Sequence, residues 1–136
     1  QISSAPVVAS HSSSRALCNH TRNLTDEDAL AIARSGGVVQ VCLYAGFISE
    51  QEEEGSVQHA ADHIDHFVRL LGIEHVGVGS DFDGDGELVG CRGANDLINL
   101  TVELLRRGYT RDQLGLLWGE NFLRAMQNVQ QKAKCQ

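Results

Sequence analysis

Three short apolar runs rich in β-branched residues, at residues 7–10, 38–44 and 76–80, constrain the fold of this chain most strongly. Helical patterns separate them. A strand that helices cover on both faces is apolar along its whole length, so the runs predict buried parallel strands. Strands that alternate with helices predict an α/β fold with right-handed crossovers.

The first two helices have clear start and stop signals. The hydroxyl of Thr25 can accept a hydrogen bond from the backbone N–H of Asp28, and the acidic residues 26–28 complement the helix dipole. Gly36 and Gly37 end this helix. We expect an acidic loop at residues 45–55, and then a helix that Ser56 caps and that runs to about residue 71.

Two further helices follow the third strand. One is predicted at residues 95–107, with its inward side chains at Leu97, Ile98, Leu100, Leu104 and Leu105. Thr110 and Gln113 have capping-box spacing and open a last helix. Its inward residues are Leu114, Leu117, Trp118, Phe122 and Met126, and we expect the polar tail after residue 127 to fray.

Composition excludes several classes of protein. The 136 residues suffice for one domain with a hydrophobic core. The net charge of −7 argues against a nucleic-acid partner, because phosphates attract basic surfaces. No apolar run approaches the ~18 residues that a membrane-spanning helix needs, so we expect no transmembrane segment.

The cysteines and the first residue bear on compartment and completeness. Cys18, Cys42, Cys91 and Cys135 show neither Cys-x-x-Cys spacing nor a disulfide framework, which favours a reducing compartment such as the cytoplasm. Cys42 lies in an apolar run and is interpreted as a small buried hydrophobe. The chain begins with Gln1, without a signal-peptide pattern, so we expect a piece of a longer protein.

The number of predicted strands also indicates a piece of a longer protein. A three-stranded sheet leaves two apolar edges open, which invites aggregation. Three βα units are what the last part of an eight-stranded barrel would supply. The expected fold is therefore a partial (β/α)₈ barrel of the TIM type, made of the last three or so βα units and a C-terminal helix.

Polar residues follow two of the predicted strands. His11 comes directly after the first strand and Asp81 directly after the third. The carboxyl ends of parallel strands meet at one edge of a sheet, where active sites gather. His11 could bind a metal or act as a base, and Arg22 could clamp a substrate carboxylate. Taken alone, each could equally be a solvated loop residue.

Two other patterns suggest metal sites. The alternating aspartates after residue 80 resemble the start of an EF-hand loop, but its twelfth position is Arg92 and a strand precedes it, so we reject the EF-hand. Another oxygen-rich calcium site at residues 81–87 stays open. His59, His63 and His66 have helical spacing, but Ala60 replaces the zincin glutamate. Packing histidines are the favoured interpretation.

Several segments taken together resemble the membrane (renal) dipeptidase family of zinc peptidases. In order along the chain they are residues 6–13 (PVVASHSS), 22–26 (RNLTD), 62–66 (DHIDH), 77–84 (GVGSDFDG), 103–109 (ELLRRGY) and 121–124 (NFLR). The resemblance covers nearly the whole chain. The segments around residues 11 and 81 are specific jointly, although each alone is weak.

The resemblance implies a (β/α)₈ barrel with two zinc ions at its mouth, which cleaves dipeptides, including those with a C-terminal D-residue. By the same resemblance, His11 binds one zinc, Arg22 holds the terminal carboxylate of the substrate and Asp81 handles the proton. Residues 1–136 would then be the C-terminal portion of a single metallo-dependent hydrolase barrel domain.

The family pattern also contains parts that have no counterpart here: an early His-x-Asp pair, a glutamate that bridges the zincs and another histidine. We therefore expect this chain to be inactive alone, and a complementing N-terminal half or a homodimer to be its protein partner. Two alternatives stay open. One is a non-catalytic metal- or peptide-binding module, and the other is a different amidohydrolase-type barrel enzyme, such as a cyclic-amide hydrolase.

Overall fold

Three parallel strands form one sheet at the centre of the protein, in a computed structural model that describes residues 3–134. The strands β1 (Val8–Ala9), β2 (Val38–Cys42) and β3 (Val76–Ser80) lie in the order β1-β2-β3. Val8 pairs with Val38, and Val39 pairs with Val76. The predicted α/β class and the parallel sheet are confirmed. Gln1 and Cys135 lie outside the described residues.

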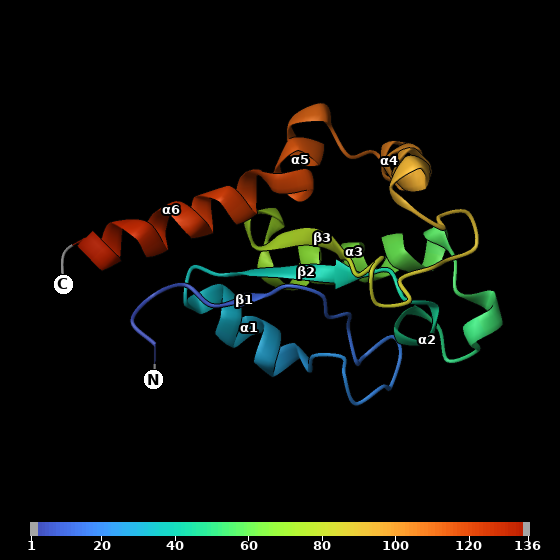
Figure 1. The fold of residues 1–136 in the computed structure, drawn as a ribbon, viewed down its shortest axis with the longest axis horizontal. Helices are drawn as coiled ribbons and strands as arrows, with labels where there is room; N and C mark the ends of the chain where they lie inside the picture. The colour runs from blue at the N-terminus through green and yellow to red at the C-terminus, as the bar shows by residue number, and fades with distance from the viewer. Residues whose placement is uncertain (1–2, 135–136) are drawn as a thin grey trace.

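Six α-helices surround the sheet in the described part of the chain. They are α1 (Asp26–Arg34), α2 (Ala45–Ile48), α3 (Val57–Leu71), α4 (Leu97–Arg106), α5 (Arg111–Gly115) and α6 (Asn121–Lys134). Figure 1 shows α2 beyond the carboxyl end of β2, whereas α6 extends toward the opposite end of the sheet. Within residues 3–134, none of these helices has the length and apolarity that crossing a bilayer requires.

The main core lies between the sheet and α3. Val39 and Val41 of β2 and Leu43 directly after it share one face and are fully buried. They belong to the same apolar cluster as Ile64 and Phe67 of α3, which are also fully buried. Val38 and Cys42 on the other face of β2 are fully buried as well, as expected of a strand that is covered on both faces. Removing such side chains from water is the main favourable term in folding.

The expected caps of α1 and α5 are confirmed. Thr25 accepts a hydrogen bond from the backbone N–H of Asp28. Thr110 and Gln113 form a reciprocal capping box, with both of its hydrogen bonds present. Ser56 is the N-cap of α3, but its hydroxyl contacts His59 and makes no capping bond.

Residues 45–55 are not the loop that the sequence predicted. They contain α2 and a 3-10 turn at Glu52–Glu54. Ile48 is 2% exposed and belongs to the core, which anchors the short helix α2. A four-residue helix is too short to show hydrophobic periodicity, so no pattern predicted it.

The last predicted helix is broken into two. A π-helical segment, Leu116–Glu120, separates α5 from α6, and Gly119 inside it has a non-helical backbone. The expected fraying after residue 127 is also wrong, because α6 continues to Lys134. Met126, predicted to face inward, is 42% exposed.

The inward face of α4 is narrower than predicted. Leu100 and Leu104 are buried and Leu97 packs against the core, whereas Ile98 and Leu105 are more than half exposed. The spacing of 97, 100 and 104 makes one stripe of a helix, and positions 98 and 105 form a separate stripe beside it.

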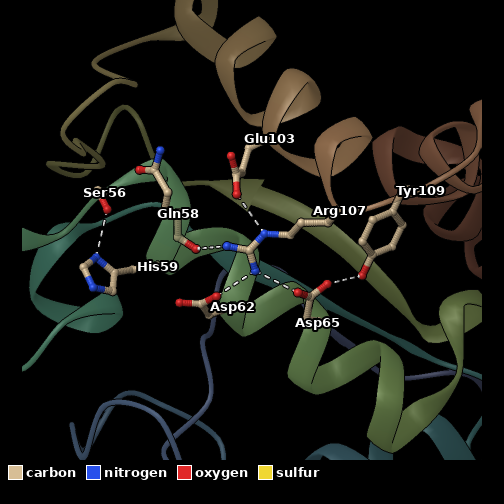
Figure 2. A network of polar contacts seen from close by, with 8 residues as sticks. All are labelled: Ser56, Gln58, His59, Asp62, Asp65, Glu103, Arg107 and Tyr109. Atoms are coloured by element: carbon tan, nitrogen blue, oxygen red, sulfur yellow. Dashed lines mark hydrogen bonds and ion pairs between the residues drawn. The ribbon is translucent and has the colours of Figure 1, made fainter.

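An ionic network joins α3 to the end of α4 (Figure 2). The guanidinium of Arg107 donates to Asp62 at 2.6 Å, to Asp65 at 2.7 Å and to Glu103 at 2.9 Å. Tyr109 donates its hydroxyl proton to Asp65 at 2.6 Å. Burial opposes the charge on Arg107, but these carboxylates outweigh it and raise the pKa of the guanidinium. Burial and the bond to Asp65 raise the pKa of Tyr109.

Helix α6 contacts the segments that lead into the strands. Arg124 donates to the carbonyls of Gly36 and Glu74, which precede β2 and β3. Asn121 donates to the carbonyls of Ile73 and Val76 at 2.7 and 2.9 Å. These bonds hold α6 at the amino ends of the strands, away from their carboxyl ends.

Candidate functional site

The residues predicted to act lie at the carboxyl ends of the strands. His11 follows β1 by two residues and Asp81 directly follows β3, while Cys42 is the last residue of β2. Hydrogen bonds continue past the strand ends, from the N–H of Ser12 to Gln40 and from that of Leu43 to Ser80, both at 2.9 Å. These bonds keep the three strand ends in line.

Just before His11 and Asp81, the backbone of Ser10, which directly follows β1, lies against Gly79 of β3. A Cβ atom added at Gly79 would overlap the carbonyl oxygen of Ser10. Only glycine permits so close an approach. Because Ser10 immediately precedes His11 and Asp81 follows Gly79 by two residues, this contact places both residues at the same edge of the sheet.

The imidazole of His11 is held on both nitrogens. Nδ1 lies 2.7 Å from the hydroxyl of Ser10, and Nε2 lies 3.2 Å from Nη2 of Arg22. A guanidinium has only donors, so Nε2 must accept and is unprotonated. The neutral ring therefore carries its proton on Nδ1. Its Nε2 lone pair is the kind of donor that metals bind.

Arg22 is placed by the aromatic ring of Phe47 as well as by His11. Its guanidinium carbon lies 5.8 Å from the centre of that ring, within the range of a cation–π contact. The centre of the His20 ring lies 4.5 Å from that of the same phenyl group, with the two planes tilted by 37°. Nδ1 of His20 accepts the backbone N–H of Arg22. Neither His20 nor Phe47 was predicted from sequence, since no motif marks them.

Arg22 and Asp81 line one cavity of about 280 Å³. Its other lining residues are Tyr44, Phe47, Gly84 and Asp85. Tyr44 donates its hydroxyl proton to Glu52 at 2.9 Å, and this bond raises the pKa of the phenol. Arg22 thus contacts His11 directly and shares a cavity with Asp81. We call His11, Arg22 and Asp81 the strand-end cluster.

Asp81 has an unusual backbone. Its φ is 72° and that of Ser80 is 41°, in the left-handed region that costs a non-glycine residue about 1–3 kcal/mol. The carbonyl of Asp81 accepts the N–H groups of Gly84 at 3.0 Å and Gly86 at 2.8 Å. Strain of this kind collects at functional sites, where the surrounding structure maintains it.

The thiol of Cys42 supports the carboxylate of Asp81. Its Sγ donates to Oδ2 of Asp81 at 3.6 Å. Burial, together with a smaller effect of the charge of Asp81, raises the pKa of Cys42 to about 11, so the group is a thiol near neutral pH. Cys42 is fully buried, as predicted, but its contact with Asp81 was missed. The register, which pairs Cys42 with Ser80, explains that contact.

The three histidines of α3 have separate partners. His59 contacts the hydroxyl of Ser56 at 2.9 Å, and His66 contacts Asp26 at 2.7 Å. His63 is 1% exposed and bonds to backbone groups of two other segments. These contacts agree with the packing interpretation.

The described residues fit a metal only in part. The unprotonated Nε2 of His11 and the carboxylate of Asp81 are suitable donors, but zinc takes about four ligands. Within residues 3–134, no three His, Cys, Asp or Glu side chains are placed to hold one ion. That finding covers the aspartates of residues 81–87, the alternative calcium site, as well as the histidines of α3.

Comparison with known proteins shows a match to one peptidase family and similarity to dipeptidases. Residues 1–136 match the family described as "Membrane dipeptidase (Peptidase family M19)". The chain is 38% identical, over 98% of its own length, to "Dipeptidase aclJ" of Aspergillus oryzae, of which it covers 32%. It therefore spans about a third of the length of this curated relative.

Two solved structures are also similar. The probable dipeptidase PvdM from Pseudomonas aeruginosa superposes with a TM-score of 0.92 at 30% identity, over 96% of this chain and 46% of the other. A metallo peptidase from Rhodobacter sphaeroides, liganded with a phosphinate mimic of the dipeptide L-Ala-D-Ala, gives 0.88 at 33% identity. That match covers 93% of this chain and 37% of the other.

Proposed function

Because the chain belongs to the membrane dipeptidase family, peptidase family M19, we propose that it supplies the strand-end cluster of a zinc-dependent dipeptidase. The observation that carries this proposal is the placement of Arg22, which contacts His11 and lines one cavity with Asp81. The phosphinate dipeptide mimic bound by the Rhodobacter sphaeroides relative supports a dipeptide as the substrate.

We also propose that the sheet is the last part of a (β/α)₈ barrel, so that residues 1–136 are the C-terminal portion of one barrel domain. The parallel strands with intervening helices and the chain's coverage of less than half of each structural relative support this. The metal ligands that the described residues lack would come from the rest of a longer protein or from a partner chain.

Each member of the strand-end cluster has a distinct role in this proposal. His11 would be one zinc ligand through Nε2, whose lone pair would pass from the hydrogen bond of Arg22 to the metal. Arg22, released from that bond, would grip the free carboxylate of the dipeptide in bidentate fashion. Asp81 would take a proton from the attacking water and pass it to the nitrogen of the leaving amine. Bound zinc supplies Lewis-acid chemistry that makes a nucleophile available near neutral pH.

The test is hydrolysis of a panel of dipeptides by this chain and by the full-length product of its gene. We expect Asp81→Asn to lower kcat by about 100-fold or more, because it removes a general base. Asp83→Asn, an exposed carboxylate on the same loop, is the matched control and should retain activity. Equal activity of Asp81→Asn and wild type would refute the role of Asp81.

Two further comparisons test the rest of the proposal. The full-length product should hydrolyse dipeptides and bind zinc, while the 136-residue chain alone should do neither at a comparable level. Cyclic amides in the same panel test the alternative of an amidohydrolase-type enzyme. Hydrolysis of cyclic amides without hydrolysis of dipeptides would replace the proposed substrate class.

A further inference from the structure

One histidine of α3, His63, has both ring nitrogens engaged although it is 1% exposed. Its Nδ1 accepts the backbone N–H of Ser14 at 2.9 Å. Nε2 must then carry the proton, and it donates to the carbonyl of Ile48 at 3.0 Å. The neighbouring carboxylates Asp62 and Asp65 bind Arg107 instead (Figure 2).

One partner of His63 lies in the segment that carries His11 and Arg22, and the other lies in α2. Ser14 follows His11 by three residues and is fully buried. Ile48 follows Phe47, whose ring lies against the guanidinium of Arg22. His63 therefore joins the segment that carries His11 to the helix that supports Arg22.

Asn23 makes a second link between the same segments. Its Nδ2 donates to the carbonyls of Cys18 and Phe47, both at 2.9 Å, and Asn23 is 1% exposed. Asn23 directly follows Arg22. A third buried side chain, Cys18, donates through Sγ to the carbonyl of Gly46 in α2 at 3.6 Å. The segment from residue 11 to residue 24 is thus tied to α2 by His63, Asn23 and Cys18, and otherwise contains little regular structure.

We propose that His63 is a positioning residue for the strand-end cluster, which holds His11 and Arg22 in their places through Ser14 and Ile48. The expected effect of His63 on zinc affinity and KM rests on the proposed function. Its expected effect on the structure of residues 11–24 does not. In metal sites, partners that orient the ligands typically contribute 10- to 100-fold to metal affinity or activity. His63 acts one step further back, through the backbone of the loop.

The pattern of bonds explains why a neutral imidazole suits this position. One ring nitrogen must accept and the other must donate, which neither a cation nor a carboxylate can do. Burial lowers the pKa of His63 to about 4, so the ring stays neutral near pH 7. Among other side chains, the amide of glutamine also combines one acceptor with one donor.

Three variants test the proposal in this chain and in the full-length gene product. His63→Leu removes both bonds while keeping an apolar side chain, and His63→Gln keeps one acceptor and one donor. His66→Leu is the matched control on the same helix, since the hydrogen bond that it removes goes to Asp26, outside residues 11–24 and 45–48. Hydrogen exchange, zinc affinity, kcat, KM and urea unfolding are measured for each.

We expect His63→Leu to speed amide exchange in residues 11–24 and 45–48 by about 10-fold or more, because a buried N–H and a buried carbonyl lose their partners. Zinc affinity should fall and the KM for dipeptides should rise, each by about 10-fold. His63→Gln should restore all three to within about threefold of wild type. His66→Leu should leave all three unchanged, whatever its effect on unfolding.

Unchanged exchange in residues 11–24 of His63→Leu would overturn the proposal. A lower unfolding midpoint with normal zinc affinity and KM would also overturn it, because that result is expected of a residue that contributes only to stability. If the wild-type full-length product hydrolyses no dipeptide, the proposed function fails instead. The exchange experiment then still decides whether His63 holds the segment that carries His11.

Discussion

The left-handed backbone at Ser80 and Asp81 depends on the residue before it. Gly79 lets the backbone of Ser10 lie against β3, and the turn that follows directs the carboxylate of Asp81 toward Cys42 and the cavity that Arg22 lines. A strained residue persists only when its surroundings maintain it. At this position the contact with Ser10 and the loop glycines do so.

Gly79→Ala should therefore push the backbone of Ser10 away from β3, because the added methyl group overlaps the carbonyl oxygen of Ser10 and no flexible side chain can yield. Overpacking of this kind costs about 1–3 kcal/mol. Urea unfolding should show that loss. Gly93→Ala is the control, since Gly93 is extended and a Cβ there meets only the end of the Asn95 side chain, at 3.3 Å. Equal stability of the two variants would contradict the prediction.

Arg22 provides a second prediction at the scale of single residues. Arg22→Lys keeps the charge but loses the planar fork that matches a carboxylate. We expect KM for dipeptides to rise by about 10-fold with a smaller change in kcat, because the lost contact is made in the ground state as well as in the transition state. Arg22→Lys and wild type should have the same KM for dipeptide amides, which lack the carboxylate. A higher KM of Arg22→Lys for the amides would exclude carboxylate binding as the role of Arg22.

At the scale of elements, the contact between α3 and α4 combines apolar packing with an ionic network. Leu100 and Leu104 of α4 belong to the main core together with Ile64 and Phe67 of α3. Arg107 closes one side of this contact by binding carboxylates from both helices. With 22% of its side chain exposed, Arg107 is screened by solvent less than a surface charge would be.

Arg107→Met should destabilise the protein by about 2 kcal/mol, because it leaves three carboxylates close together without their cation. The figure is below that for a fully buried pair, since solvent still reaches Asp62. Arg106→Met is the matched control. Its side chain is 72% exposed and only 4.0 Å from Glu103 at its nearest. Thermal or urea unfolding of both variants provides the measurement, and similar losses in the two would rule out the network as the cause.

At the scale of the whole molecule, α6 contacts the segments that enter the sheet, while the strand-end cluster occupies the exit edge. The buried His63 connects α3 with two segments at that exit edge. Its ionisation is therefore linked to the folding of the whole chain. Protonation in the native state would place a charge in the core and remove the acceptor for Ser14.

The pKa of His63 is about 4 in the folded protein, against 6.5 for the free group. The unfolded state takes up the proton first, so the stabilisation is complete above pH 6.5 and is lost as the pH falls from 6.5 to about 4. The loss attributable to this group is about 3 kcal/mol. Urea unfolding across this range should show a steeper decline for wild type than for His63→Gln. His59→Gln is the control, and parallel curves for wild type and His63→Gln would contradict the assignment.

Local signals in the sequence determined much of the fold. The bounds of β3, the Thr25 cap and the Thr110 capping box all follow from neighbouring residues, and the structure confirms them. The three residues of the strand-end cluster were also predicted from sequence. His11 and Asp81 could be placed at one edge because parallel strands share a direction, and this rule needs no knowledge of side-chain contacts.

Only the tertiary structure decided the contacts that join distant segments. His63 bonds to Ser14, 49 residues away, and to Ile48, 15 residues away, and no periodic pattern in the sequence predicts either partner. The same is true of the thiol of Cys42 on Asp81 and of the helix α2 that Ile48 anchors. Periodicity and capping depend on a few adjacent residues. The hydrogen-bond partner of a buried polar side chain depends instead on which backbone groups lie close to it after the chain has packed.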